Sequence, residues 1–260
     1  MSESPSADPT RAGKKAMVTG AASGIGAAVT ERLASDGSMV YAVDLDADRL
    51  AEFVDSLGDA GASIHQLPCD LSDFAAIESL PTDVDILVNN AGIQHVAPIQ
   101  DFPPETFDLI IALMLTAPFR LIRQSLPHMY SAGWGRVVNI SSVHGIRASE
   151  FKSAYVAAKH GLEGLSKVTA LEGAPHGVTS NCVNPAYVRT ALVEKQIADQ
   201  AAAHGIDESE VLSQIMLAPA AVKRLLEPAE VADMVAFLIG PSSASITGSS
   251  FSMDGGWSAH

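Results

Sequence analysis

Three residues suited to proton transfer stand in the middle part of the chain. Ser142, Tyr155 and Lys159 follow the spacing Ser-x12-Tyr-x3-Lys, and the stretch SAYVAAKHGLEGLSKVTALE predicts a helix over 153–172. Residues four apart share one face of a helix, so Lys159 would place an ammonium beside the Tyr155 phenol. A neighbouring positive charge lowers the pKa of a tyrosine from its usual value of about 10. Ser142 ends the apolar run RVVNIS, where its hydroxyl can hydrogen-bond a reacting oxygen.

Most Tyr-x3-Lys pairs are ordinary neighbours on a helix surface, so this pair needs support from other motifs. The segment VTGAASGIG carries Gly20, Gly24 and Gly26 between the strand-like AMVTG and a predicted helix over 24–35. Glycines let the backbone approach a pyrophosphate, and the helix N-terminus supplies unpaired N–H groups. The spacing differs from the commoner Gly-x-Gly-x2-Gly. A tight turn that needs glycine for steric reasons alone is the competing interpretation.

A second predicted strand, MVYAVD, ends at Asp44. A carboxylate at this place in a dinucleotide-binding unit accepts hydrogen bonds from the adenosine ribose. A 2′-phosphate would meet its negative charge, and the glycine loop has no Arg or Lys to offset that charge. We therefore predict NAD rather than NADP as the cofactor.

The remaining chain alternates strand and helix patterns. Strands are predicted near 16–20, 39–43, 63–67, 84–89, 136–141, 177–183 and 247–252, and helices near 24–35, 47–57, 105–130, 153–172 and 228–239. This rhythm favours parallel pairing with right-handed crossovers. It predicts an α/β fold, a single doubly wound (Rossmann-type) parallel sheet of about seven strands with helices on both faces. Ligands of such sheets bind beyond the carboxyl ends of the strands, where Gly20, Asp44, Asn89 and Ser142 are all expected.

Two segments depart from this rhythm. Residues 1–13 are polar and contain Ser and Pro, so we expect a flexible tail followed by one domain over 14–260. Residues 186–226 are rich in Ala, helical in pattern and bounded by Pro185 and Pro228. They are too many for a simple connection, so we expect a helical lid over a substrate.

Composition excludes several classes of protein. The 260 residues, 47% of them hydrophobic, are enough for one substantial core. The formal net charge of −14 argues against nucleic acid and anionic membranes as partners. Cys69 and Cys182 are too few and too far apart for a disulfide framework, and we expect no metal. A charged-then-apolar N-terminal segment and a long apolar run are both absent from the sequence, so we expect a cytoplasmic protein without a membrane partner.

Taken together, TGAASGIG, the NNAG motif at 89–92 and the triad of Ser142, Tyr155 and Lys159 resemble the short-chain dehydrogenase/reductase family from about Lys15 onward. The resemblance implies hydride transfer with a nicotinamide cofactor, with Tyr155 as acid or base and Ser142 at the substrate oxygen. It implies that Lys159 lowers the pKa of Tyr155 and holds the nicotinamide ribose. It also implies a homotetramer.

The same resemblance extends to residues that would contact the cofactor. The expected set is Gly20, Ser23, Gly24, Ile25, Gly26, Asp44, Asp70, Asn90, Gly92, Tyr155, Lys159, Pro185, Val188 and Thr190. Asp70 matches a position at the adenine, and Asn90 one at the adenosine ribose. Pro185 and Thr190 flank a segment at the nicotinamide amide and the pyrophosphate. For each of these single residues, a role in forming a turn is the alternative.

Several further motifs are most similar to the members of the family that oxidise D-3-hydroxybutyrate to acetoacetate. They are NNAGIQHVAPI, SSVHG, KSAYVAAKHG, VTALE, VEKQI and DGGW. The resemblance implies that a small hydroxy acid binds at Gln94, Ser142, His144, Lys152, Tyr155, Tyr187 and Gln196. Lys152 would supply charge for the carboxylate and the others oriented hydrogen bonds. The alternatives are a larger 3-hydroxy acid, a sugar acid or a 3-oxoacyl substrate, and a non-catalytic NAD-binding protein.

Two positions depart from the family pattern. Met114 in IIALMLTAPF stands where the family usually has an Asn that holds a water connecting the Lys to solvent. A thioether cannot donate a hydrogen bond and accepts one only weakly. Methionine at this position has two possible explanations. The protein is either a natural variant with lower turnover or a substituted or decayed enzyme. Tyr187 stands where such dehydrogenases often have Trp, and Trp257 is a candidate for an interface between copies.

One feature of the chain itself supports the expected tetramer. Ala158, Gly161, Leu162 and Leu165 form a small or apolar stripe on the predicted helix over 153–172. Such a stripe would let the helices of two copies pack closely. Burial against the sheet of the same chain is the competing interpretation.

Overall fold

A seven-stranded parallel sheet forms the centre of the molecule. The computed structural model describes residues 12–259, so the first eleven residues of the predicted tail lie outside the described residues. The strands are β1 (Lys15–Thr19), β2 (Met39–Asp44), β3 (Ile64–Pro68), β4 (Ile86–Asn89), β5 (Gly135–Ile140), β6 (Val178–Pro185) and β7 (Ser250–Met253). Their order is β3-β2-β1-β4-β5-β6-β7, and every pair is parallel. The chain winds outward from β1 and returns at β4, which leaves a crevice for ligands at the carboxyl ends of these two strands.

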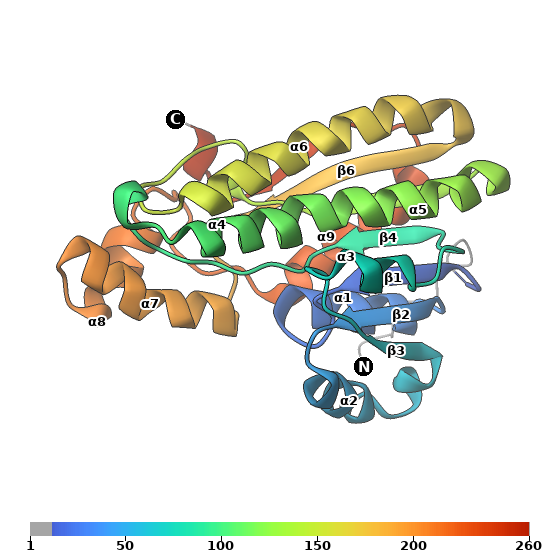
Figure 1. Ribbon diagram of the computed structural model, residues 1–260, viewed down its shortest axis with the longest axis horizontal. Coiled ribbons are helices and arrows are strands. Elements are labelled where there is room, and N and C mark those ends of the chain that lie inside the picture. Colours follow the sequence, from blue (N-terminus) through green and yellow to red (C-terminus); the bar gives the residue numbers. More distant parts are fainter. Residues whose placement is uncertain (1–11, 260) are drawn as a thin grey trace.

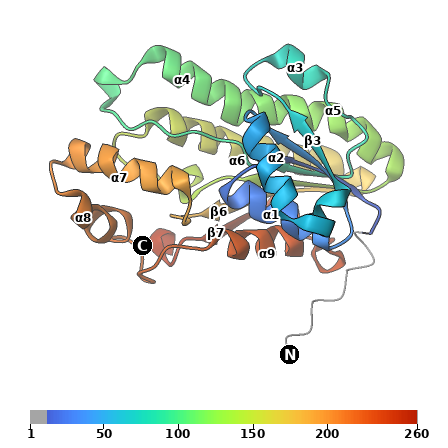
Figure 2. The same cartoon turned by 90° about the horizontal axis from the view of Figure 1, so that it is seen from below.

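Helices cover both faces of this sheet (Figures 1 and 2). The helices are α1 (Gly24–Ser35), α2 (Ala47–Ser56), α3 (Phe74–Glu78), α4 (Pro104–Ile111), α5 (Ala117–Ala132), α6 (Ser153–Gly173), α7 (Ala191–His204), α8 (Glu208–Val211) and α9 (Pro228–Ile239). One apolar cluster joins α1, α2 and α9 to the sheet, and another joins α3 and α5 to its opposite face. The predicted doubly wound sheet is therefore confirmed.

Aspartate side chains cap the N-termini of α2 and α3. The Asp46 carboxylate accepts a hydrogen bond from the N–H of Arg49 at the start of α2, and the Asp73 carboxylate accepts two from the first turn of α3. Such caps satisfy N–H groups that have no partner within the helix. The sequence-based helix ranges do not include α3, although Asp73 is the kind of residue that marks such a start.

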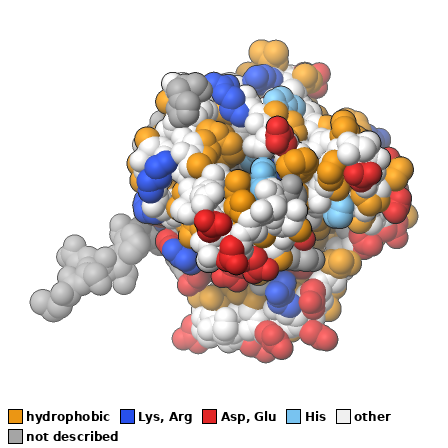
Figure 3. Space-filling view, turned by 90° about the vertical axis from the view of Figure 1, so that its left-hand side faces the viewer, with side chains coloured by type: hydrophobic (Ala, Val, Ile, Leu, Met, Phe, Trp, Pro, Cys, Tyr) orange, Lys and Arg blue, Asp and Glu red, His pale blue; other side chains and the backbone are white. Residues whose placement is uncertain are grey.

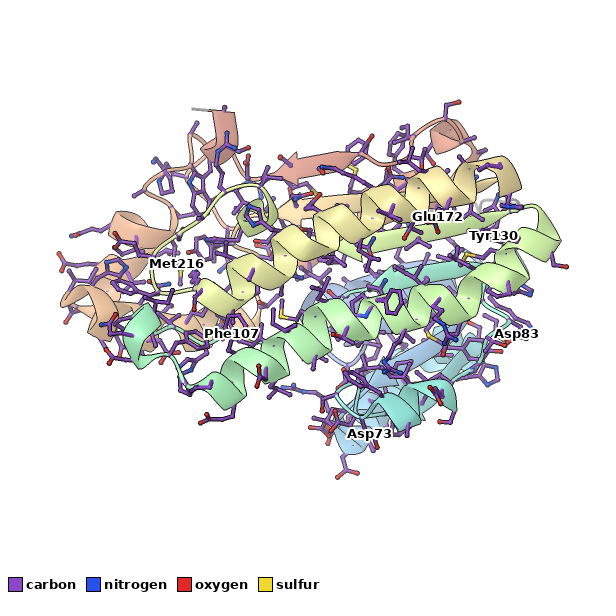
Figure 4. The ribbon with its side chains drawn as sticks, turned by 45° about the horizontal axis from the view of Figure 1, so that its top comes forward. Asp73, Asp83, Phe107, Tyr130, Glu172 and Met216 are labelled. Carbon is purple, nitrogen blue, oxygen red and sulfur yellow. The ribbon has the colours of Figure 1, made fainter. Side chains whose placement is uncertain are left out.

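The helix predicted over 105–130 contains a wide turn in its middle. Residues Ala112–Thr116 form a π-helical turn between α4 and α5, and Met114 lies at its centre. Pro118 follows, and it has no N–H to donate to the carbonyl four residues earlier, that of Met114. π-helical turns occur frequently at functional sites, and this one faces the large cavity described below. α5 and α6 then run side by side, with Tyr130 and Glu172 near their ends (Figure 4).

The segment 186–226 contains α7, α8 and a second π-helical turn, Leu212–Met216. In Figure 1 it projects at one end of the sheet. It carries a small apolar cluster of its own, in which the buried members are Tyr187, Val193, Ala201, Val211 and Met216, with Trp257 packed against them. The side chains of Leu192, Lys195 and Ala203 are outside the description.

Two general features complete the description of the fold. Within residues 12–259 no helix is long and apolar enough to cross a membrane, and no group of three His, Cys, Asp or Glu residues could hold a metal ion. Cys69 and Cys182 are both buried as free thiols. Seen from the α7–α8 end, the surface carries many Asp and Glu side chains between hydrophobic patches (Figure 3).

Candidate active site

One cavity of about 600 Å³ runs along the carboxyl ends of the strands and collects nearly all of the predicted site residues. The predicted residues that line it are Gly20, Ser23, Gly24, Ile25, Asp44, Asp70, Asn90, Gly92, Gln94, Ser142, His144, Lys152, Tyr155, Lys159, Pro185, Tyr187, Val188, Thr190 and Gln196. Of the predicted site residues, only Gly26 does not reach the cavity. These residues are far apart in the sequence, and the parallel sheet brings them to one edge.

The glycine turn between β1 and α1 is built for close backbone approach. A Cβ on Gly26 would overlap the carbonyl oxygen of Gly20, so Gly26 lets the turn close on itself beneath the cavity. Gly24 has a φ of +54°, and a Cβ there would lie 2.9 Å from the Thr190 Cγ2. Ser23 precedes α1 without forming a side-chain cap. The first N–H groups of α1 therefore begin at the cavity wall, where a helix N-terminus favours a phosphate.

Asp44 and Asp70 lie at the far end of the cavity, at the ends of β2 and β3. One Asp44 carboxylate oxygen accepts a hydrogen bond of 2.9 Å from the N–H of Ala22, and the other accepts one of 3.2 Å from the N–H of Asp46. A carboxylate retains further lone pairs for ribose hydroxyls. Hydrogen bonds from the hydroxyl and the N–H of Ser72 lower the pKa of Asp70. The exposed Arg49 lines the same end, and the spacing of the motifs did not point to it.

Asn90 joins the end of β1 to the end of β4. Its side-chain amide donates hydrogen bonds to the carbonyls of Thr19, at 2.9 Å, and Gly20, at 3.3 Å. The Thr19 hydroxyl in turn accepts hydrogen bonds from the N–H groups of Asn90 and Ala91, at 2.9 and 3.0 Å. The Asn90 side chain therefore fixes the floor of the crevice.

The serine, tyrosine and lysine of the triad meet at the opposite end of the cavity. Ser142 lies two residues past β5, and its Oγ accepts a hydrogen bond of 3.1 Å from the N–H of His144. The Lys159 Nζ lies 5.6 Å from the centre of the Tyr155 ring and donates a hydrogen bond of 2.6 Å to the Ile140 carbonyl. Both α6 residues therefore face the end of β5, as their spacing predicts.

Burial sets the protonation of this triad. It raises the pKa of Tyr155 to about 12, and a hydrogen bond with Ser142 acts in the opposite direction. Burial lowers the pKa of Lys159 to about 8. The sequence predicted that Lys159 lowers the pKa of Tyr155. In the structure burial is the main cause of the Tyr155 pKa and the opposing effect comes from Ser142, while the Lys159 ammonium donates its hydrogen bond to the Ile140 carbonyl.

A buried lysine lies beside the triad. The Lys152 Nζ donates a hydrogen bond of 3.0 Å to the Tyr187 hydroxyl, and burial lowers the pKa of Lys152 to about 8. The residue before it, Phe151, has a φ of +67°, a left-handed conformation that is rare for a bulky side chain. Such strain persists only where the surrounding structure enforces it, often at a functional site.

Aromatic rings enclose the space around Lys152. Tyr187 stacks on Trp257, with ring centres 6.2 Å apart and planes at 9°. The His144 ring meets Tyr155 and Trp257 edge-on. Burial lowers the pKa of His144 to about 3, so the imidazole is neutral, and its Nε2 lies 2.9 Å from the Ser149 hydroxyl. Trp257 was a candidate for an interface. Trp257 lines the cavity, because the turn at Gly255 and Gly256, both with positive φ, folds the C-terminus back over the site.

Two amides complete the predicted substrate set. The Gln94 side chain donates a hydrogen bond of 2.9 Å to the His95 carbonyl. Gln196 is buried on α7 and reaches the cavity from the α7–α8 side. Gln94, Gln196 and Lys152 therefore all line the same cavity.

Met114 also lines this cavity. It is buried, and a Cβ built on Gly92 would lie 3.3 Å from its Cε and 3.5 Å from its Sδ. The π-helical turn thus presents a thioether at the position where the family pattern has an amide.

The residues present fit a dinucleotide. A glycine turn, a helix N-terminus and a carboxylate lie in the order that pyrophosphate and ribose require, and the triad lies at the other end of the same cavity.

Comparisons with a family model, with known sequences and with solved structures all point to the same family. The model of the short chain dehydrogenase family matches residues 14–201. D-beta-hydroxybutyrate dehydrogenase of Rhizobium meliloti (strain 1021) is 45% identical over 256 residues, which cover 95% of this chain and 99% of that protein. The enzyme of the same name from Cupriavidus necator is 42% identical over 255 residues, which cover 95% and 98% of the two chains. A crystal structure of a point variant of actinorhodin polyketide ketoreductase with NADPH superposes with a TM-score of 0.89 at 32% identity, covering 95% and 98%. The chain belongs to the short-chain dehydrogenase family.

Proposed function

We propose that this protein is an NAD-dependent oxidoreductase that interconverts D-3-hydroxybutyrate and acetoacetate. Two relatives with 45% and 42% identity over nearly their whole length carry that activity in their names. The family supports the reaction class. The substrate, the preference for NAD and the role of each site residue are our proposals.

The environment of Lys152 is the main support for a carboxylate substrate. Lys152 as a whole residue is 3% exposed, and it lines the same cavity as Ser142 and Tyr155. A buried charge needs a partner of opposite charge, and among the residues that the structure describes Lys152 forms no ion pair. The carboxylate of a small hydroxy acid would supply that partner, with Gln94 and Gln196 on the surrounding walls.

The chemistry follows from the positions of three side chains. A bound nicotinamide would accept the hydride from the carbinol carbon or return it to the carbonyl carbon. Tyr155 takes the hydroxyl proton during oxidation and gives it back during reduction. Ser142 hydrogen-bonds the same substrate oxygen. Lys159 stabilises the phenolate by its charge, and Lys152 orients the acid through its carboxylate.

The preference for NAD is supported by Asp44. Its carboxylate lies at the adenosine end of the cavity, where a 2′-phosphate would place a second negative group. The actinorhodin ketoreductase structure contains NADPH, so the family does not determine the choice. The exposed guanidinium of Arg49 lies at the same end and opposes the effect of Asp44.

We extend the proposal to the rest of the molecule. The segment 186–226 acts as the lid over the substrate, supported by the cavity-lining Tyr187 and Gln196 on either side of the start of α7. The enzyme works as a homotetramer in the cytoplasm, in ketone body metabolism. Residues 14–260 act as one dehydrogenase domain.

A substrate panel tests this proposal. Purified protein is assayed with NAD and with NADP against D- and L-3-hydroxybutyrate, a longer 3-hydroxy acid and gluconate, by the absorbance of the reduced cofactor. We expect the highest kcat/KM for the D-isomer with NAD. A higher value for gluconate or the longer acid contradicts the substrate. NADH binding without turnover of any acid supports a non-catalytic NAD-binding protein instead.

A further inference from the structure

A turn near the end of the chain carries Trp257 to the triad end of the large cavity. The turn spans residues 254–258 and follows β7 directly. The Trp257 ring stacks on Tyr187 and meets His144 edge-on, with 5.2 Å between the ring centres of the last two. The His144 ring meets Tyr155 edge-on as well. His144, Trp257 and Tyr187 therefore form one aromatic wall that begins at the triad.

One residue accepts hydrogen bonds from three successive N–H groups of this turn. Asp254 is 6% exposed. Its Oδ1 accepts a hydrogen bond of 2.9 Å from the N–H of Gly256, and its Oδ2 accepts one of 2.9 Å from the N–H of Ser258. Its carbonyl accepts one of 3.2 Å from the N–H of Trp257. The carboxylate thus fixes the backbone on both sides of Trp257, and an amide, which has a single acceptor oxygen, could not form both side-chain bonds.

The same turn is held against the segment 186–226. The Gly255 carbonyl accepts hydrogen bonds from the N–H groups of Ala221, at 2.7 Å, and Val222, at 2.9 Å. A Cβ on Gly255 would lie 3.0 Å from the Val222 carbonyl oxygen, so the two backbones are in close contact. The turn therefore has a fixed seat on which Asp254 can orient Trp257.

A second cavity, of about 290 Å³, lies on the other side of Tyr187. Ala186 and Tyr187 line both cavities, so they form the wall between them. The charged residues that line it in the described part of the chain are Arg224 and Asp254, and both are already paired. The Arg224 guanidinium donates hydrogen bonds of 2.6 and 2.7 Å to the Glu230 carboxylate. The remaining walls are mainly apolar and suit an alkyl group: Met216, Leu217, Ala220, Val222, Leu226 and Met253.

We propose that Asp254 is a positioning residue that holds Trp257 as a partition between the two cavities, and that this partition restricts the substrate to short 3-hydroxy acids. The inference rests on the proposed function and specifies the substrate class further. With the carboxylate at Lys152 and the third carbon at the triad, a longer alkyl chain needs the space that Trp257 fills. Without the ordered turn, such a chain would extend past Tyr187 into the second cavity.

The fluorescence of Trp257 tests the positioning role directly. Trp134 and Trp257 are the two tryptophans of the sequence, so Trp134→Phe leaves Trp257 as the single tryptophan. In that background, Asp254→Ala should move the emission maximum to longer wavelengths and increase quenching by acrylamide, because the released indole meets water. Asp254→Asn keeps one acceptor oxygen, and its emission should lie between the two. These measurements need neither substrate nor cofactor.

Steady-state kinetics test the partition. Asp254→Ala should raise kcat/KM for D-3-hydroxyhexanoate relative to D-3-hydroxybutyrate by about tenfold or more, since methylene groups in an apolar pocket discriminate on that scale. KM for D-3-hydroxybutyrate should rise more than kcat falls, because Ser142 and Tyr155 keep their places. Trp257→Ala should shift the selectivity in the same direction. Because Asp254 acts through Trp257, the double variant should equal Trp257→Ala alone.

Asp73→Ala is the matched control. The Asp73 carboxylate also accepts hydrogen bonds from two backbone N–H groups, those of Ala75 and Ala76 at the start of α3, and Asp73 lines neither cavity. This variant loses the same kind of contact at a distant place. It should leave the Trp257 emission and the selectivity between the two acids unchanged.

Unchanged Trp257 emission in a folded Asp254→Ala protein overturns the positioning role, and so does a double variant that loses much more activity than Trp257→Ala. Unchanged selectivity in Trp257→Ala overturns the partition. If Asp254→Ala does not fold, Asp254→Asn and Trp257→Ala decide the same two questions. If the wild-type protein oxidises no 3-hydroxy acid, the proposed function fails, while the emission of Trp257 still decides the role of Asp254.

Discussion

The hydroxyl of Tyr187 accepts a hydrogen bond of 3.0 Å from the ammonium of Lys152. This contact joins the residue before α6 to the segment after β6, and it leaves the phenolic hydrogen of Tyr187 free to point elsewhere. Burial raises the pKa of Tyr187, so the phenol stays protonated at every physiological pH. The pair therefore offers an anion two adjacent donors, one charged and one neutral.

The pH dependence of substrate binding follows from Lys152. Its pKa is lowered to about 8, so the ammonium is present below that pH and lost above it, while the substrate carboxylate stays ionised throughout. KM for D-3-hydroxybutyrate should therefore rise as the pH increases through about 8. Lys152→Met should raise KM by tenfold or more, because a hydrogen bond to a charged group contributes roughly 1.5–3 kcal/mol. In that variant KM should not depend on pH between about 7 and 9. An unchanged KM in Lys152→Met would rule out a carboxylate at this position.

Tyr155→Phe tests the acid–base role. Only the hydroxyl takes part in proton transfer, so kcat should fall by ~10²–10⁴-fold, whereas the Kd for NADH should stay within about twofold of the wild-type value. Tyr130→Phe on α5 is the control. Its ring stacks on His176, with ring centres 4.1 Å apart, and Tyr130 does not line the cavity, so its loss of the hydroxyl should leave kcat unchanged. A Tyr155→Phe enzyme with a third of the wild-type kcat would refute the assignment.

Asp44→Asn tests the cofactor preference. The amide oxygen can still accept the hydrogen bond from Ala22, so the glycine turn keeps its support while the negative charge is lost. The ratio of kcat/KM for NAD over NADP should fall by about tenfold. Asp44→Ala should relax the ratio as well, but it should also raise KM for NAD because Ala22 loses its partner. Equal use of NAD and NADP by the wild-type enzyme would show that Asp44 does not discriminate.

Met114→Asn tests the departure from the family pattern. If an amide at this position restores a water connection to Lys159, kcat should rise while KM for the hydroxy acid changes little, because proton transfer and carboxylate binding are separate. Met114→Leu conserves the volume without adding a hydrogen-bonding group, and its kcat should equal that of the wild type. A folded Met114→Asn enzyme with unchanged or lower kcat would mean that protons leave the site by another route.

The stripe on α6 that suggested close packing between copies lies largely inside the chain itself. Ala158 and Leu162 are buried in the chain's own core, and a Cβ on Gly161 would lie 2.7 Å from the Leu115 side chain. The predicted stripe therefore packs within one copy. The exposed apolar side chains on this face are Phe119 on α5 and Val168 and Leu171 on α6, at 50%, 51% and 77% exposure.

These exposed residues provide the test for a tetramer. Light scattering at micromolar concentration should give four times the chain mass for the wild type, and Leu171→Asp should lower that mass by placing a charge in an apolar contact. A monomeric mass for the wild type would contradict the tetramer, and an unchanged tetramer in Leu171→Asp would place the contact elsewhere.

The residues that sequence could place are those governed by local rules. Residues four apart lie on one face of any helix, so the spacing of Tyr155 and Lys159 was enough to bring them together. A glycine is needed at position 26 because the backbone of the turn passes too close for a Cβ. The sheet edge collected Asp44 and Ser142 because parallel strands end together. The seven expected strands all form, whereas α3 was not among the expected helices and the helix expected over 105–130 is interrupted by the π-helical turn Ala112–Thr116.

The residues that sequence could not place depend on contacts between distant segments. Trp257 reaches the cavity only because the C-terminal turn folds over Tyr187. Glu163 looks like a solvated helix residue until β6 and β7 cover it. The direction of the Lys159 ammonium depends on the carbonyl of Ile140, which no spacing reveals. The π-helical turn had one local signal, Pro118, whose missing N–H removes a regular helical bond.

The separate apolar cluster of the α7–α8 segment bears on the energetics of the whole molecule. A segment with its own small core can open as a cooperative unit at a lower free energy than global unfolding. Amide hydrogens of α7 should therefore exchange faster than those of β5 and β6, whose residues are buried throughout. Tyr187 and Trp257 belong to this cluster and also enclose Lys152. Local opening of this segment would admit water to that lysine, and we expect substitutions that stabilise the segment to tighten substrate binding as well.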